Sequence, residues 1–252
     1  MENLAPNNKR IVKNTLLLYV RMLFLMVVSL YTSRVVLNAL GIEDFGIYNV
    51  VGGMVAMFSM LSGSLSAAIT RFITYELGRG DREKLRTIFS SAVTIQLGLA
   101  AIIIILAEVL GIWSLNSKMT IPLDRLAAAN WVFQFSVLTF AINLVSVPYN
   151  ASIIAHERMS AFAYISIFEA VGKLAIAYLI TISPIDRLVF YAILMCAVAL
   201  IVRFTYGIYC KRHFEECMYH FIFDKNLLKD MFGFAGWNFI RSEERRVGKE
   251  CR

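Results

Sequence analysis

Charged residues are scarce in this sequence. They make up 17% of the 252 residues, whereas 58% are hydrophobic, and the mean hydropathy is +0.64. A soluble domain of this length could not bury so much apolar surface. The scarcity of charge therefore excludes a soluble globular protein and predicts a protein that lies in a membrane.

Histidine and cysteine are also few, and the common catalytic patterns are missing. The sequence has no nucleophile elbow, no His-Glu-x-x-His pattern and no Gly-Lys-Ser/Thr phosphate loop. We therefore predict no enzyme, no catalytic residue and no cofactor. Four residues come nearest to a metal site because they would share one face of a continuous helix: Cys210, His213, Cys217 and His220. Their order is unusual for zinc, so we attribute the spacing to chance and predict no metal site.

Long apolar runs recur along the whole chain. Each is near or above the roughly 20 residues that cross a bilayer as a helix, the form that satisfies the backbone polar groups in lipid. The first run is too long for a secretory signal, so we interpret it as a retained span. The short loops leave no room for a separate soluble domain. The sequence predicts an all-α integral membrane protein with a six-helix lobe over 14–209, whose spans are 14–33, 46–70, 87–112, 127–147, 160–182 and 188–209.

The basic residues predict the orientation of these spans. Thirteen Lys and Arg residues lie in the N-terminal arm 1–13 or beside the connections that follow the second, fourth and sixth spans, and four lie on the opposite side. Because basic loops stay in the cytoplasm, we place the N-terminus there, together with the connection 210–231. The net charge of +7 is then mainly a topology signal, and we predict no nucleic-acid partner.

Arg21 is the most informative charge inside a span. A charge at mid-bilayer costs roughly 2.5–3.5 kcal/mol, so it needs a partner or a watery cavity. At 100° per residue, Arg21 falls in line with Arg10, Asn14 and Thr32, and such a polar stripe does not suit a lipid-facing surface. We expect a cavity wall that offers the guanidinium to an anionic headgroup. The alternative is an ion pair with an acid on another helix.

Other ionisable residues inside the spans have weaker claims to function. Glu169 and Lys173 have the i, i+4 spacing of a mutually neutralising pair, which suits a structural role and a place on a transport route equally well. Arg203 lies in the cytoplasmic half of the sixth span, and reaching toward the headgroups is its preferred interpretation. Glu108, near the outer end of the third span, is assigned no role.

Small residues line one face of the second span. Such residues let helix backbones approach closely in lipid, and close packing is the preferred interpretation. The alternative is that this face gives room for a substrate or marks a bending point. The residues of this face are Gly52, Ala56, Ser59, Gly63, Ser66 and Thr70.

The chain changes character near its end. Residues 232–240 have the composition expected at the start of a seventh span, whereas eight of the twelve residues 241–252 are charged. A helix in lipid could not continue through them. The twelve residues resemble a translated short-read sequencing adapter, so we expect a non-native tail, with a basic tail that binds anionic lipid as the alternative.

Several stretches resemble the bacterial polysaccharide-export flippases of the multidrug/oligosaccharidyl-lipid/polysaccharide superfamily, especially those of Bacteroidetes. The most diagnostic stretch is Leu40-Gly41 followed by Asp44-Phe45-Gly46-Ile47-Tyr48. The sequence FGFAGWN at 232–238 matches the usual opening of the seventh span. Further similar stretches are 9–53, 71–81, 128–140, 147–174 and 209–217.

The resemblance implies a MATE-like fold of two six-helix lobes around a cavity that opens alternately to each side. The implied substrate is a polyprenyl-pyrophosphate-linked oligosaccharide, which is flipped across the bacterial inner membrane through the cavity while its lipid tail stays in the bilayer. Arg21 is the first choice for a substrate contact, with Arg34 and Asn38 near the outer end as weaker choices. The second lobe is missing, so the resemblance implies that this chain is an inactive N-terminal-lobe fragment.

Two other functions compete with this interpretation. A cation-coupled exporter of small cationic compounds would need a free acid deep in the lobe, but Glu169 already lies next to Lys173. A non-transporting membrane scaffold for envelope assembly would have a packed interior without a hydrated cavity. The sequence favours an anionic substrate and leaves open whether a proton or sodium gradient drives transport.

Overall fold

The computed structural model describes residues 4–117, 121–122, 124–183, 186–220 and 233. Within this part the chain forms helices and no strand, which confirms the predicted all-α membrane fold. Residues 234–252, with most of the expected seventh span and the whole expected tail, lie outside it. The α-helices are α1 (Leu4–Met57), α2 (Ser59–Arg79), α3 (Arg82–Leu106), α4 (Ile112–Ser117), α5 (Leu126–Ala155), α6 (Met159–Leu179) and α7 (Arg187–His213). Short helices of other types are η1 (Ala107–Gly111), η2 (Ile180–Ile182) and η3 (Glu215–Cys217).

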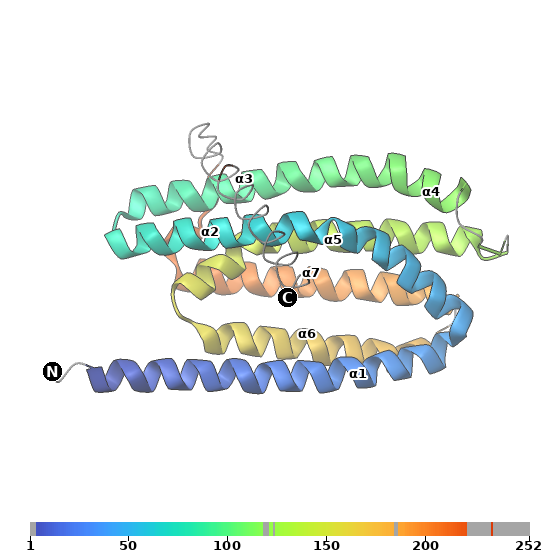
Figure 1. The fold of residues 1–252 in the computed structure, drawn as a ribbon, viewed down its shortest axis with the longest axis horizontal. Helices are drawn as coiled ribbons and strands as arrows, with labels where there is room; N and C mark the ends of the chain where they lie inside the picture. Colours follow the sequence, from blue (N-terminus) through green and yellow to red (C-terminus); the bar gives the residue numbers. More distant parts are fainter. Residues whose placement is uncertain (1–3, 118–120, 123, 184–185, 221–232, 234–252) are drawn as a thin grey trace, which may run out of the picture.

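Helix α1 reverses direction at Gly41, as Figure 1 shows. Gly41 has φ 82° and ψ 173°, a conformation that residues with a Cβ rarely adopt. The part of α1 before Gly41 is the first span. The part after Gly41 continues into α2 as the second span, with one distorted turn where the Phe58 N–H donates to Val55 O at 3.1 Å.

Five described segments are long and apolar enough to cross a membrane. The first of them contains the Gly41 reversal, so it holds the first span and the start of the second. The chain therefore passes along the long axis of the molecule six times within the described part (Figure 1). The five segments are Asn14–Met57, Arg82–Leu115, Leu126–Ala155, Met159–Ile182 and Arg187–His213.

Two helices continue beyond the predicted ends of their spans. The second span was expected to end at Thr70, but α2 continues to Arg79, where Gly80 adopts φ 75° and its N–H donates to Glu76 O and Leu77 O. The fourth was expected to end before Pro148, but α5 runs through this proline to Ala155. A helix ends where a cap satisfies its last carbonyls, and hydropathy does not report that position.

The third span begins at a side-chain cap and contains a π-helical turn. Asp81 Oδ1 accepts a hydrogen bond from the Lys84 N–H at 3.0 Å, which starts α3. At the other end, the Phe133 ring of α5 packs on Gly111 of η1. A Cβ at Gly111 would lie 2.1 Å from Phe133 Cζ, so any other residue at this crossing would displace the Phe133 ring.

Helix α5 lies at the centre of the lobe. It packs against α7, α2, α3 and α1, while α6 lies along the first part of α1 (Figure 1). The hydroxyls of Tyr31 and Tyr178 join α1 to α6 at 2.7 Å. Large apolar side chains of α1, such as Leu16 and Met22, remain exposed, as expected of a surface whose solvent is lipid.

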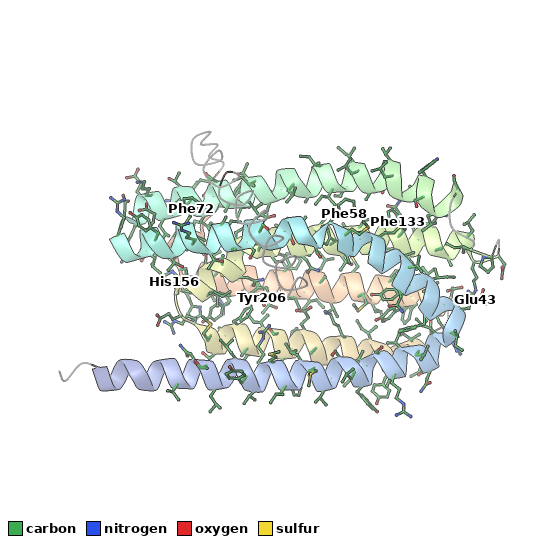
Figure 2. All side chains as sticks on the ribbon, in the orientation of Figure 1. Glu43, Phe58, Phe72, Phe133, His156 and Tyr206 are labelled. Carbon is green, nitrogen blue, oxygen red and sulfur yellow. The ribbon has the colours of Figure 1, made fainter. Side chains whose placement is uncertain are left out.

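The connections gather at the two ends of the bundle. Figure 2 shows Glu43 at the end that holds the Gly41 reversal and His156 at the opposite end. The His156 end, called the inner end below, also holds the α2–α3 turn and the end of α7 (Figure 1). The basic residues Arg82, Arg158 and Lys211 therefore belong to one end. The cytoplasmic location of that end stays a prediction.

Candidate functional site

A cavity of about 380 Å³ lies between α1, α6 and α7, and we call it the charged chamber. It brings together three of the predicted site residues, Arg21 from α1 and Glu169 and Lys173 from α6. These are the charged residues of its described lining. Neutral polar groups complete its polar wall, namely Ser29, Thr32, Ser33, Tyr48, Asn49, Ser166 and Tyr191.

Arg21 contacts an aromatic ring and no acid. Its guanidinium carbon lies 4.3 Å from the centroid of the Phe162 ring. Among the described residues no carboxylate pairs with it, so the alternative of an internal ion pair is not found there. The Arg21 Nε and Thr32 Oγ1 are buried without a hydrogen-bond partner. Buried polar atoms of this kind carry a desolvation penalty unless water or a ligand satisfies them.

Glu169 and Lys173 form the predicted pair. Lys173 Nζ donates to Glu169 Oε1 at 2.6 Å, and the two side chains are 41% and 33% exposed, respectively. The i, i+4 spacing is therefore confirmed as an ion pair on one face of α6. Because these two charges cancel, Arg21 is the uncompensated charge of the chamber lining.

A second cavity of about 290 Å³ lies beside the charged chamber, and we call it the neutral chamber. Tyr48 lines both cavities, and its ring meets that of Tyr191 edge to face with centroids 4.8 Å apart. The small residues Gly52, Ala56 and Ser59 form one wall of the neutral chamber.

The small-residue face of the second span borders open space. A Cβ added at Gly52 or Gly63 would meet no atom within 4 Å. In the described part of the chain, close helix packing is therefore not found at these two glycines. Three members of the face line the neutral chamber instead, which agrees with the alternative that the face gives room.

The remaining predicted site residues lie elsewhere. Arg34 and Asn38 are exposed on α1 and line neither chamber. Arg203 is half-buried, and its guanidinium carbon lies 3.9 Å from the centroid of the Tyr149 ring. It packs inside the bundle and shares no chamber with Arg21.

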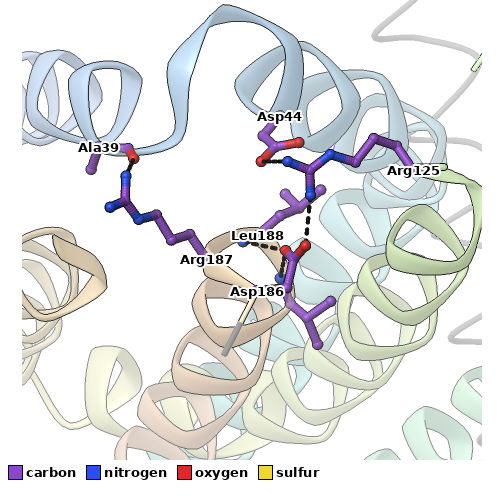
Figure 3. Close-up of polar contacts among 7 residues, drawn as sticks. Ala39, Asp44, Arg125, Asp186, Arg187 and Leu188 are labelled. Atoms are coloured by element: carbon purple, nitrogen blue, oxygen red, sulfur yellow. Dashed lines mark hydrogen bonds and ion pairs between the residues drawn. The ribbon is translucent and has the colours of Figure 1, made fainter. Parts of the chain in front are cut away.

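Sequence reasoning missed a cluster of polar contacts at the end that holds the Gly41 reversal, called the outer end. Figure 3 shows this cluster, which we call the outer clasp. Arg125 lies between two carboxylates, with Nη2 3.4 Å from Asp44 Oδ2 and Nη1 2.6 Å from Asp186 Oδ2. Arg187 Nη1 donates to Ala39 O at 3.2 Å. The clasp thus holds both sides of the Gly41 reversal. The sequence had indicated only a topology signal for Arg125 and Arg187. Asp44 had been noted only as part of the stretch 40–48 that carries the family resemblance.

A second set of ion pairs closes the inner end, beside a groove of about 910 Å³. His156 contacts Glu216 and stacks on Phe214 with ring centroids 4.1 Å apart. Burial alone would raise the pKa of Glu216, but hydrogen bonds from His156 and from its own backbone N–H, together with the His156 charge, hold that pKa below its usual range. Arg82 adds a contact of 2.5 Å to Glu215.

The four residues considered for metal do not share a helical face. Helix α7 ends at His213, and Cys217 lies in the separate turn η3. The continuous helix assumed for this spacing is therefore wrong. Hydrogen bonding to the Cys210 thiol and burial raise the pKa of the Cys217 thiol, which disfavours the thiolate needed for metal binding.

The comparisons with known proteins identify a family. Residues 11–243 match the family described as polysaccharide biosynthesis protein. Searches of curated proteins and of solved structures give no match. The family match covers both chambers and the outer clasp. The chain, a multi-pass membrane protein, therefore belongs to the polysaccharide biosynthesis protein family.

Proposed function

We propose that this chain forms half of the substrate route of a flippase. The flippase moves polyprenyl-pyrophosphate-linked oligosaccharide across the bacterial inner membrane by alternating access. The observation that carries the proposal is the charged chamber, in which Arg21 is uncompensated near the middle of the first span. Family membership supports a glycan as cargo, and the chamber supports an anionic one.

The chemistry of Arg21 suits a pyrophosphate. A guanidinium keeps its charge inside the membrane and offers several donors in a fixed fork, which matches phosphate oxygens. Each charge-assisted hydrogen bond contributes about 1.5–3 kcal/mol. Two such bonds would offset the roughly 2.5–3.5 kcal/mol cost of keeping Arg21 at mid-bilayer. The buried Arg21 Nε has no hydrogen-bond partner among the described residues, so a ligand that reached it would remove a desolvation penalty.

The lipid tail of the substrate can stay in the bilayer. Helix α1 forms a wall of the charged chamber through Arg21 and also exposes apolar side chains such as Val20 and Leu23. A ligand held at Arg21 could therefore keep its tail against α1 while its headgroup enters the chamber. Helices that separate a polar route from lipid are the usual walls of repeat-based transporters.

A second, facing lobe completes the route in this proposal. The described helices would then be the N-terminal lobe of a MATE-like transporter, with the inner end in the cytoplasm. A proton or sodium gradient is the proposed driving force. The facing lobe would close the other side of this cavity.

The competing functions find less support in the geometry. An exporter of small cations would present a free carboxylate, but the Glu169 carboxylate accepts a hydrogen bond from Lys173. A scaffold would fill its interior, whereas the lobe contains two adjoining chambers, one of which carries Arg21. The first observation disfavours a cationic cargo, and the second favours a transporter over a scaffold.

Replacement of Arg21 tests the proposal. We expect Arg21→Ala, in a strain that depends on this gene, to abolish export of surface glycan without lowering the amount of protein in the membrane. Arg21→Lys should retain part of the export, because it keeps the charge but loses the fork. Arg212→Ala, at the exposed end of α7, is the matched control and should export normally. Normal export by a well-expressed Arg21→Ala variant would contradict the proposal.

A further inference from the structure

The groove of about 910 Å³ at the inner end, called the inner groove below, lies outside the proposed substrate route. Its described walls come from the end of α2, the start of α3, the turn between α5 and α6, and the segment after α7. Beside it, the apolar segments end at Ala155 and His213 and begin again at Met159. Because the apolar core of a bilayer ends with these segments, the inner groove lies at the depth of the lipid headgroups.

Most of the acidic side chains in the lining of the inner groove already have partners. Glu215 contacts Arg82, and Glu216 contacts His156. Glu157 also makes an interaction within the chain. These three carboxylates are therefore occupied and compete little for other cations of the groove.

Two arginines of the lining pair with no carboxylate in the described part of the chain. They are Arg86 of α3 and Arg158 of the turn between α5 and α6. The Arg86 Nε is buried without a hydrogen-bond partner, so a ligand oxygen that reached it would remove a desolvation penalty. The Glu83 carboxylate is also unpaired there, but it is exposed, and water and salt screen its charge. The inner groove thus offers two uncompensated guanidinium groups.

The turn between α5 and α6 fixes the backbone of Arg158. The Arg158 N–H donates to Ile153 O at 3.0 Å. The Glu157 N–H donates to Ile154 O at 3.0 Å, and Glu157 adopts φ 56°, the left-handed conformation that ends a helix in this bonding pattern. The backbone at Arg158 is therefore held in place, while its exposed side chain can turn toward a ligand in the groove.

A phosphate diester suits this pair of arginines. A guanidinium presents paired donors that match two phosphate oxygens. Basic pockets between helices at the membrane surface are typical binding sites for the headgroups of anionic lipids. The lining also contains the apolar side chains of Leu77 and Leu85, against which the first carbons of a lipid chain can pack.

We propose that the inner groove binds an anionic phospholipid of the adjacent leaflet, whose phosphate is held by Arg86 and Arg158. The bound lipid joins the start of α3 to the turn between α5 and α6, and it stabilises the inner end of the lobe because it binds only the folded chain. The described linings of the inner groove and the charged chamber have no residue in common. The inference therefore does not depend on the role of Arg21.

The test titrates the full chain, purified in a neutral detergent, with three probes while the thermal unfolding midpoint is measured. The probes are phosphatidylglycerol, phosphatidylcholine with the same acyl chains, and inorganic phosphate. Phosphatidylglycerol should raise the midpoint, since a ligand of the folded state stabilises it, whereas the other two probes should have little effect at the same concentration.

Three variants locate the site. Arg86→Gln and Arg158→Gln should each weaken the affinity for phosphatidylglycerol about tenfold, the effect of losing one charge-assisted hydrogen bond. Arg212→Gln is the matched control, because Arg212 is exposed on α7 and lies outside the lining of the groove, and it should bind as the wild type does. Since Arg158 is exposed, Arg158→Gln should keep the lipid-free midpoint, so its lost affinity would not come from a damaged fold.

Several results would overturn the lipid site. An equal effect of phosphatidylcholine would show that the anionic headgroup is not required, and an equal effect of inorganic phosphate would show a site for free anions. Wild-type affinity in Arg86→Gln or Arg158→Gln, or an equal loss in Arg212→Gln, would remove the phosphate from this pair of arginines. Loss of phosphatidylglycerol binding in Arg21→Ala would place the lipid in the charged chamber.

Discussion

At the scale of single residues, the electrostatics of the charged chamber depend on one ion pair. Lys173 keeps the Glu169 carboxylate occupied at 2.6 Å, so the carboxylate does not neutralise Arg21 in the same chamber. A structural pair on α6 thus gives the chamber its positive character. The Glu169–Lys173 pair could be predicted from the sequence, because residues at i, i+4 spacing are neighbours on one helix.

Removal of Lys173 should therefore impair transport through Arg21. In Lys173→Met, Glu169 loses its partner and becomes available to Arg21, and we expect surface glycan export to fall about tenfold, the effect of a coupling near 1.4 kcal/mol. Export is measured as surface glycan at matched protein abundance. The double variant Lys173→Met, Glu169→Gln should recover to within about twofold, since no carboxylate then competes for Arg21. Equal loss in the single and double variants would argue against this electrostatic role.

The presence of Arg21 and Glu169 in the lining of one chamber could not be predicted from the sequence. Helix α6 lies along the first part of α1, although about 150 residues separate them in the chain. The polar stripe indicated that Arg21 faces inward, but no local pattern specifies which helix it meets. The outer clasp was missed for the same reason, because Arg125, Asp44 and Asp186 come from three separate connections.

At the scale of elements, helix ends and one reversal decide the shape of the lobe. Hydropathy located the apolar centre of each span, because the bilayer selects for apolar length. It could not locate the ends at Gly80 or Ala155, because capping and packing set them. The Gly41 reversal is the clearest local feature, since its backbone conformation and the clasp around it set the direction of the second span relative to the first.

Substitution of Gly41 should destabilise the lobe. Its φ of 82° and ψ of 173° strain any residue with a Cβ, at a cost of about 1–3 kcal/mol, so Gly41→Ala should lower the thermal unfolding midpoint by several degrees. No atom lies within 4 Å of the added Cβ, so the effect would come from the backbone and not from a clash. The midpoint is measured in detergent by unfolding of the purified chain.

Gly46 provides the control for this prediction. It lies in the same helix, has no positive φ and would also place a Cβ in open space. Gly46→Ala should therefore leave the midpoint unchanged or raise it slightly, because alanine favours helix. An equal decrease in both variants would show that the Gly41 conformation has no special role.

At the scale of the whole molecule, the six membrane passes of the described part form a lobe that contains two adjoining chambers. The charged chamber and the neutral chamber share Tyr48, and ion-pair clusters close the two ends of the bundle. The sequence could predict an apolar helical lobe with polar residues facing inward. It could not predict that the small-residue face of the second span would border a chamber, because small residues are equally common where helices pack closely.

The most direct test of the central claim is the access of water to position 21. Arg21→Cys, in a background without the native cysteines, is treated with a water-soluble thiol reagent in intact membranes. We predict labelling from at least one side of the membrane, and protection by a polyprenyl-pyrophosphate-linked sugar. Arg21→Cys that is labelled from neither side, while a cysteine introduced at exposed Glu43 is labelled, would contradict a transport route through the charged chamber.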